Sequence, residues 1–157
     1  MPSFTRTIES PLSASDSVAA LKHFQRTTEW DKTCIKAELK SGDSGCIGAV
    51  YDLTVDFLGK NVDVSYEITS LEDNQNGASV VLKGTSDSSQ IEDIISTKPN
   101  PNGNGCTLIY RTIININFPY NMIDCAIGLM FRKTVSDAME GLKLFLQKEK
   151  TEQDQAK

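Results

Sequence analysis

The residues of this sequence that could do chemistry in a protein interior are mainly hydroxyls. Tyr51, Tyr66, Tyr110 and Thr112 all fall on the apolar side of segments in which apolar and polar residues alternate. A buried hydroxyl needs a hydrogen-bond partner, and a partly hydrated cavity would provide one. These side chains are therefore the first reason to expect a ligand cavity rather than a completely filled core.

A carboxylate beside these hydroxyls would add acid–base chemistry. Glu92 and Asp93 lie on a weakly patterned segment, and either could act with Tyr66 or Tyr110 as the acid or base of a cyclase or dehydratase. The competing interpretation is that both carboxylates face solvent and that the tyrosines belong to the core, as these residue types usually do. We favour the second interpretation, and we predict no catalytic residue.

Nucleophilic catalysis and phosphate binding find little support. His23 is the single histidine and lies in a short helical segment, where we expect a surface position. No nucleophile-elbow motif accompanies it. The glycine-rich run 42–48 lacks the Gly-Lys-Ser/Thr ending of a phosphate loop and precedes a strand rather than a helix. We interpret that run as a hairpin.

The four cysteines indicate reduced structural thiols. None of them is separated from another by the two-residue interval of metal knuckles and redox motifs. A disulfide framework and a zinc site are therefore the weaker interpretations. We predict neither a metal nor a cofactor.

Length and charge indicate one ordinary globular domain. The chain has 157 residues, of which 39% are hydrophobic and 24% charged, and its net charge is −5. Without a Lys/Arg cluster, this charge argues against nucleic acid as a partner. No apolar run approaches the roughly 18 residues of a membrane span, and the N-terminus lacks a signal-peptide core. We therefore expect a cytoplasmic protein without an integral membrane segment.

The hydroxyls must be positioned by strands. A first strand over 3–9 ends at Pro11, and a short helical stretch follows around 18–24. Period-two patterns then recur over 35–39, 51–57, 62–68, 79–86, 90–96 and 107–118, with turn formers between them. Short turns predict an antiparallel meander of six or seven strands, with the helices on one face.

The last long segment has the period of a helix. Pro119 stops the final strand, and apolar residues then recur at steps of three and four over about 120–148. This helix would cross the concave face of the sheet. The tail at 150–157 has no apolar residue larger than alanine, so we predict a disordered tail after a single domain at 1–149.

Together, the apolar faces of the strands and the helix define an expected ligand-binding surface. Met130 and Met139 add adaptable apolar surface on the helix. We expect the ligand to contact Tyr51, Leu53, Val55, Tyr66, Ile68, Tyr110, Thr112 and Ile114 on the strands, and Ile127, Met130, Phe131 and Thr134 on the helix. A core filled by these same side chains is the alternative.

The order of these features over 3–146 resembles the helix-grip fold of the START/Bet v 1-like (SRPBCC) superfamily, in particular its polyketide cyclase/dehydrase and lipid-transport-like group. The resemblance is carried by Ser10-Pro11, by Thr28-Glu29-Trp30-Asp31, by Gly42, Gly45 and Gly48, and by Ala138-Met139-Glu140-Gly141-Leu142-Lys143. It implies an α+β fold in which a curved antiparallel sheet surrounds a long C-terminal helix.

The resemblance also implies a hydrophobic ligand, such as a lipid, a sterol or a polyketide, held between sheet and helix by a carrier or sensor. The superfamily has no universal catalytic motif, so the fold alone does not choose among its activities. A cyclase or dehydratase and a co-chaperone-like interaction module are the alternatives. An enzyme would place ionisable groups with shifted pKa values beside the cavity.

Overall fold

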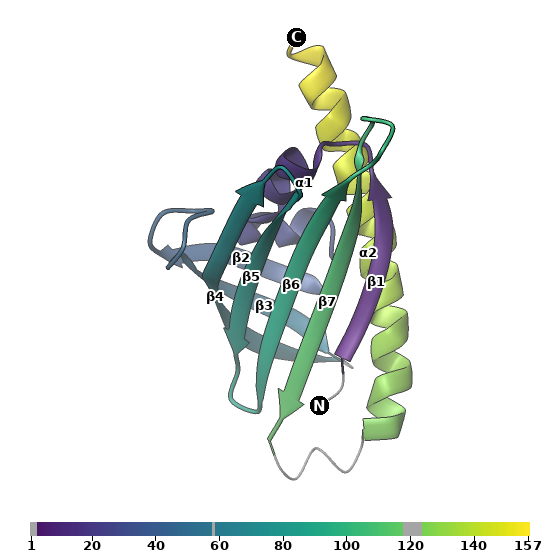
Figure 1. Ribbon diagram of the computed structural model, residues 1–157. Helices are drawn as coiled ribbons and strands as arrows, with labels where there is room; N and C mark the ends of the chain where they lie inside the picture. Colours follow the sequence, from purple (N-terminus) through teal and green to yellow (C-terminus); the bar gives the residue numbers. More distant parts are fainter. Residues whose placement is uncertain (1–2, 58, 118–123) are drawn as a thin grey trace.

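The computed structural model describes residues 3–57, 59–117 and 124–157, with the side chains of the last segment described from residue 132. Its elements are β1 (Ser3–Ser10), α1 (Ala14–Leu21), the 3₁₀ helix η1 (Phe24–Glu29), β2 (Cys34–Ser41), β3 (Val50–Phe57), β4 (Lys60–Asn74), β5 (Gly77–Thr85), β6 (Ser89–Pro99), β7 (Cys106–Ile116) and α2 (Asp124–Gln155). The strands form one seven-stranded sheet in the order β1-β7-β6-β5-β4-β3-β2 (Figure 1).

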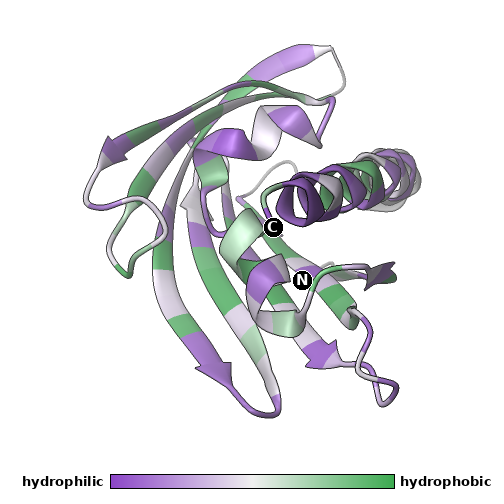
Figure 2. Cartoon of the chain, turned by 90° about the horizontal axis from the view of Figure 1, so that it is seen from above, coloured by the Kyte–Doolittle hydropathy of each residue, from purple (hydrophilic) through white to green (hydrophobic). Residues whose placement is uncertain are grey.

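All neighbouring strands are antiparallel, and the sheet curves around α2 (Figure 2). The predicted helix-grip fold, with its meander, its short helices after the first strand and its long C-terminal helix, is confirmed. The meander follows from the short turns, because adjacent strands joined by few residues pair antiparallel.

The short helices close one end of the concave face. Ser13 caps α1, since its hydroxyl accepts a hydrogen bond of 3.0 Å from the backbone N–H of Asp16. Val18 and Leu21 of α1 are buried in the core, together with Phe24 of η1. The inward residues of the sheet at this end are also fully buried, among them Ile68, Val80, Ile95 and Leu108.

The second half of α2 packs tightly against this core. Ala138, Leu142 and Leu146 are buried at helical spacing. Gly141 lies so close to the chain at Trp30 that a Cβ added to it would lie 2.0 Å from the Trp30 carbonyl oxygen. The two segments that carried the resemblance, around Trp30 and around Gly141, therefore meet in the structure.

Residues 150–157, the tail that the sequence predicts beyond the domain, begin as part of α2, which continues as helix to Gln155. The Gln153 amide donates a hydrogen bond of 2.9 Å to the Asp16 carboxylate of α1, and Lys150 pairs with Asp154 one turn further along the helix. Polar contacts thus continue the helix beyond its last large apolar residue. The pattern of apolar residues indicates only which residues are buried, so it did not predict that the helix extends into this polar segment.

Strand β2 also differs from its prediction. Its alternation predicted Ile35, Ala37 and Leu39 on a buried apolar face, but Ile35 is 56% exposed and Leu39 is 38% exposed. The pairing of β2 with β3 is interrupted by register shifts between Cys34 and Lys36 and between Leu39 and Ser41. A bulge breaks the period of two, and β2 lies at the edge of the sheet with a neighbour on one side.

Arg26 joins η1 to the end of α2. Its guanidinium donates hydrogen bonds to Glu29 at 2.7 Å and to Glu149 at 2.5 Å, and it lies 4.8 Å from the centroid of the Phe145 ring. The two carboxylates raise the Arg26 pKa further above its ordinary value. The planar fork and the stacked face are properties of arginine that lysine lacks.

We therefore expect Arg26→Lys to lower the free energy of unfolding by about 1 kcal/mol, measured by urea denaturation. The control is Lys143→Ala, which removes an exposed pair with Glu140 and should change stability by less than about 0.5 kcal/mol. Equal effects of the two substitutions would mean that Arg26 does not link the two helices.

Candidate functional site

The Asp93 carboxylate on β6 is a buried acid on the concave face of the sheet. It is 5% exposed. Thr112 lies directly opposite on β7 and donates a hydrogen bond of 2.7 Å to Asp93 Oδ1. The hydroxyls of Tyr66 and Tyr110 also lie near this carboxylate and, acting as donors to it, lower its pKa. Three of the four hydroxyls predicted to face inward thus converge on one acid, and we call Asp93, Thr112, Tyr66 and Tyr110 the Asp93 cluster.

The sheet register and η1 position the two tyrosines of this cluster. Tyr66 is paired with Gly84, and a Cβ at Gly84 would lie 2.7 Å from the Tyr66 ring, so the glycine makes room for the ring on the concave face. Phe24 packs edge-on against Tyr66 at a centroid distance of 5.2 Å. Trp30 packs similarly against Tyr110 at 6.1 Å. These edge-to-face contacts fix the ring orientations.

Burial is the main influence on the pKa of Asp93. It raises the pKa of Asp93 to about 6, while the hydrogen bonds from Thr112, Tyr110 and Tyr66 act in the opposite direction and Asp31 adds a smaller increase. Burial also raises the pKa of Tyr66 and Tyr110 well above the ordinary value, and the nearby Asp93 charge adds to this. The tyrosines therefore stay protonated donors, whereas Asp93 can exchange a proton near neutral pH.

Asp31 and Cys34 lie close to this cluster. The Asp31 carboxylate accepts hydrogen bonds from the Thr33 backbone N–H at 2.9 Å and from its hydroxyl at 2.8 Å. Burial nevertheless raises the Asp31 pKa. Burial and the Asp31 charge raise the pKa of the Cys34 thiol to about 12. Cys34 is thus a protonated structural thiol and not a nucleophile.

The favoured interpretation of Asp93 as a solvent-facing carboxylate is wrong. In the segment from Ile91 to Ile95, both alternating sets contain apolar residues, so the pattern left the inward face open. The register with β7 decides it, because Asp93 pairs with Thr112 and therefore shares its face. The orientation of Asp93 follows from its pairing with the next strand, which the pattern of the single segment does not show.

The structure describes nine of the twelve side chains expected at the ligand. On the concave face, Tyr51, Leu53, Tyr66, Ile68, Tyr110 and Ile114 are buried, and Val55 and Thr112 are half-buried. Thr134 on α2 is half-buried as well. Ile127, Met130 and Phe131 lie outside the described side chains. That these residues contact a ligand remains a prediction.

Tyr51 uses its hydroxyl differently from the other two inward tyrosines. The backbone N–H of Gly45 donates a hydrogen bond of 2.7 Å to it, and it donates one of 3.2 Å to the Lys22 carbonyl oxygen. Tyr51 therefore ties the glycine-rich loop between β2 and β3 to the end of α1. Its ring packs near Phe24 at a centroid distance of 6.3 Å.

His23 is half-buried rather than on the surface. Its Nδ1 lies 2.8 Å from the Ser44 hydroxyl, which also donates a hydrogen bond of 2.9 Å to the Gln25 side chain. Burial lowers the His23 pKa, as do Lys22 and Arg26. Among the hydrogen bonds of the described residues, none joins His23 to a carboxylate. The hydrogen bonds of Ser44 with His23 and Gln25 therefore connect the 42–48 loop to the helical region. His23 lacks the orienting acid of a catalytic triad.

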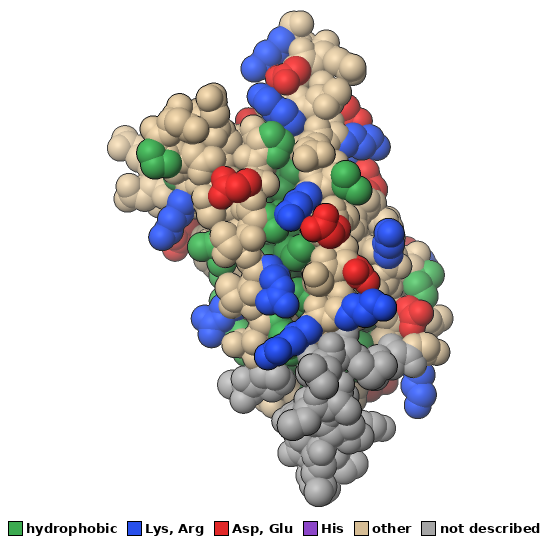
Figure 3. Space-filling model, turned by 90° about the vertical axis from the view of Figure 1, so that its right-hand side faces the viewer, with side chains coloured by type: hydrophobic (Ala, Val, Ile, Leu, Met, Phe, Trp, Pro, Cys, Tyr) green, Lys and Arg blue, Asp and Glu red, His purple; other side chains and the backbone are tan. Residues whose placement is uncertain are grey.

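At the end of the concave face away from α1, several inward side chains are not fully buried. Val55, Val62 and Ile91 face inward there but are only partly buried, as is Val135 on α2. The side of the molecule that carries α2 shows a strip of hydrophobic side chains between charged ones (Figure 3). The Asp93 cluster lies between these residues and the fully buried end near α1.

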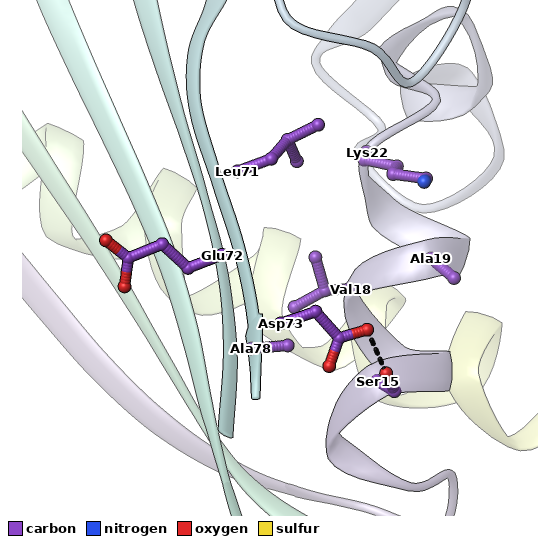
Figure 4. Close-up of a pocket in the computed structure, with 8 residues that line it drawn as sticks. All are labelled: Ser15, Val18, Ala19, Lys22, Leu71, Glu72, Asp73 and Ala78. Carbon is purple, nitrogen blue, oxygen red and sulfur yellow. Dashed lines mark hydrogen bonds between the residues drawn. The ribbon is translucent and has the colours of Figure 1, made fainter. Parts of the chain in front are cut away.

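Two surface grooves lie elsewhere on the described part of the chain. One, of about 170 Å³, runs between α1 and the β4–β5 hairpin, and a hydrogen bond from Ser15 to Asp73 crosses it (Figure 4). The other, of about 380 Å³, lies between α1 and the end of α2. Neither includes a residue of the Asp93 cluster, and both are lined by charged side chains.

Comparison with solved structures identifies the fold. The protein TTHA0849 from Thermus thermophilus matches with a TM-score of 0.77 at 13% identity, covering 94% of this chain and 99% of the other. A STAR-related lipid transfer protein from Xanthomonas axonopodis matches with a TM-score of 0.73 at 15% identity, covering 92% and 85%. The Zhui aromatase/cyclase from Streptomyces sp. R1128 matches with a TM-score of 0.71 at 11% identity, covering 94% and 92%.

This chain has the START/Bet v 1-like fold. The resemblance inferred from the sequence is confirmed at that level. No family model and no curated protein matches the sequence itself. Among its described residues, no helix has the length and apolar character needed to cross a membrane. The fold alone assigns no ligand or reaction, so the site must be judged from the residues present.

Proposed function

We propose that this protein binds a hydrophobic small molecule, such as a lipid, a sterol or a polyketide, between the concave face of its sheet and α2, and acts as a carrier or sensor. The observation that carries the proposal is the position of the Asp93 cluster. It is a compact set of polar groups among the buried apolar side chains of the concave face. A site of this kind gains affinity from apolar burial and orientation from a few polar groups.

The solved structures support the same ligand class. Proteins described as a lipid transfer protein and as an aromatase/cyclase share the fold over more than nine-tenths of this chain. Their low identity restricts the inference to a hydrophobic ligand. The Asp93 cluster adds that the ligand carries at least one polar group that can hydrogen-bond to a carboxyl or a phenol.

Native mass spectrometry and thermal-shift assays against a fatty alcohol, a sterol and an aromatic polyketide test this proposal. At a concentration about one hundred times its Kd, a ligand should raise the free energy of unfolding by about 2.7 kcal/mol. Val62→Trp, which adds bulk at a partly buried inward position of β4, should weaken binding at least tenfold, or by about 1.4 kcal/mol.

The matched control is Ile113→Trp, which adds the same bulk on the convex face of β7 and should leave binding unchanged. Circular dichroism checks that both variants are folded. Stabilisation by none of the three ligand classes, or equal effects of the two tryptophan variants, would contradict binding between sheet and helix.

An enzyme of the cyclase or dehydratase kind is the second candidate, and Asp93 is the observation that favours it. A buried acid with a pKa of about 6 beside two protonated phenols can accept a proton from a substrate and return it. Turnover of a poly-β-keto substrate that is lost in Asp93→Asn would establish the enzyme. Binding that persists in this variant without turnover in the unmodified protein would favour the carrier.

A further inference from the structure

The free edge of the sheet carries most of the exposed apolar surface of the described residues. Four of their large hydrophobic side chains are exposed, and three of these, Ile35, Leu39 and Ile47, lie on β2 or on the loop that follows it. Strand β2 pairs with β3 on one side and ends the sheet on the other. An edge strand offers backbone N–H and C=O groups to another strand, and proteins usually guard such an edge.

The charges on β2 complement themselves in an antiparallel arrangement. Lys36 and Glu38 are both exposed and lie on either side of Ala37, with their charged groups 3.7 Å apart. If β2 of a second copy pairs antiparallel with Ala37 opposite Ala37, then Lys36 lies opposite Glu38 of the second copy. The symmetry of the pair forms this contact twice.

The charges also select among the possible registers, whereas Ile35 and Leu39 lie next to the register shifts at the two ends of the regular segment and flank the charge pairs. A shift of one strand by two residues changes these contacts. In one direction, Lys36 lies opposite Lys36 of the second copy, and in the other direction, Glu38 lies opposite Glu38 of the second copy. Like charges directly opposite destabilise a strand pair, so the Ala37-centred register is preferred over its neighbours.

From this self-complementarity we infer that β2 is the contact surface of a homodimer, in which the sheets of two copies join through antiparallel β2 strands centred on Ala37. The inference is independent of the proposed ligand. Because register shifts in β2 on both sides of Lys36–Leu39 limit the regular pairing, the contact is smaller than the roughly 1,200 Å² of stable interfaces. The dimer therefore dissociates at low protein concentration.

Sedimentation velocity of the full chain from about 20 μM to about 1 mM tests the inference. The unmodified protein should shift from monomer towards twice the monomer mass across this range. Glu38→Lys places lysines opposite each other and should raise the dimer dissociation constant at least tenfold. The double variant Lys36→Glu/Glu38→Lys restores opposite charges in the same register and should return the constant to within about threefold of the original.

Glu67→Lys is the matched control, because Glu67 is an exposed glutamate on the central strand β4, and its reversal should not change the dissociation constant. A chain that stays monomeric up to the highest concentration overturns the inference. The inference is also overturned if the double variant does not recover the dissociation constant of the unmodified protein, or if the control variant dimerises as weakly as Glu38→Lys. Circular dichroism ensures that loss of the dimer is compared between folded proteins.

Discussion

Replacing Gly141 with alanine is expected to lower the free energy of unfolding by about 2 kcal/mol, which corresponds to a Tm lower by about 6 °C for a chain of this size. Helix propensity alone predicts the opposite sign, since alanine is about 1 kcal/mol better than glycine inside a helix. The tertiary contact decides the outcome. An added Cβ would lie 2.0 Å from the Trp30 carbonyl oxygen, and a backbone atom cannot move aside as a side chain can.

The measurement is urea denaturation, followed by the fluorescence of Trp30, the single tryptophan of the chain. Its emission should shift to longer wavelength in Gly141→Ala as α2 moves away from η1. Ser136→Ala at an exposed position of α2 is the control and should stabilise the protein by a few tenths of a kcal/mol. If Gly141→Ala were as stable as the control, the close approach of α2 to Trp30 would be refuted.

Asp93→Asn is expected to stabilise the protein at pH 8 and to have little effect at pH 4. The folded-state pKa of Asp93 is raised from 3.8 to about 6. The folded protein therefore holds the proton more tightly than the unfolded chain. This contribution to stability is complete below pH 3.8 and is lost as the pH rises through about 6, with a total of about 3 kcal/mol.

Asparagine keeps the shape of the side chain without the buried charge, so the variant should gain about 2 kcal/mol at pH 8 relative to the unmodified protein. Thermal unfolding across pH 4 to 8 measures the difference. Glu92→Gln, whose side chain lies on the opposite face of β6, is the control and should leave the pH profile unchanged. A profile identical in Asp93→Asn and the unmodified protein would mean that Asp93 is not a buried, uncompensated acid.

A stability gain in Asp93→Asn would also bear on function. The ion pairs formed by the described residues do not include Asp93, so its charge is held by hydroxyls alone. A protein that keeps a destabilising acid in its interior commonly uses it. The same variant therefore tests both the electrostatics of the site and its part in ligand binding or turnover.

Much of the fold could be predicted from the alternation along single strands. Tyr66 and Ile68 on β4, and Tyr110 and Ile114 on β7, were assigned to the buried face from their spacing, and they are buried there. These strands have one apolar and one polar set, so burial of one face is the only arrangement that removes the apolar set from water. The prediction of a buried face on β2 failed because its bulges break this spacing.

The sequence by itself therefore determined the order of the elements, the inward faces of the regular strands and the apolar stripe of the last helix. Each of these depends on a local period that a single segment contains. Only the tertiary structure decided that Asp93 faces inward, that three hydroxyls converge on it and that Gly141 meets Trp30. These arrangements depend on strand register and on helix approach between residues far apart in the chain, and a local pattern does not encode them.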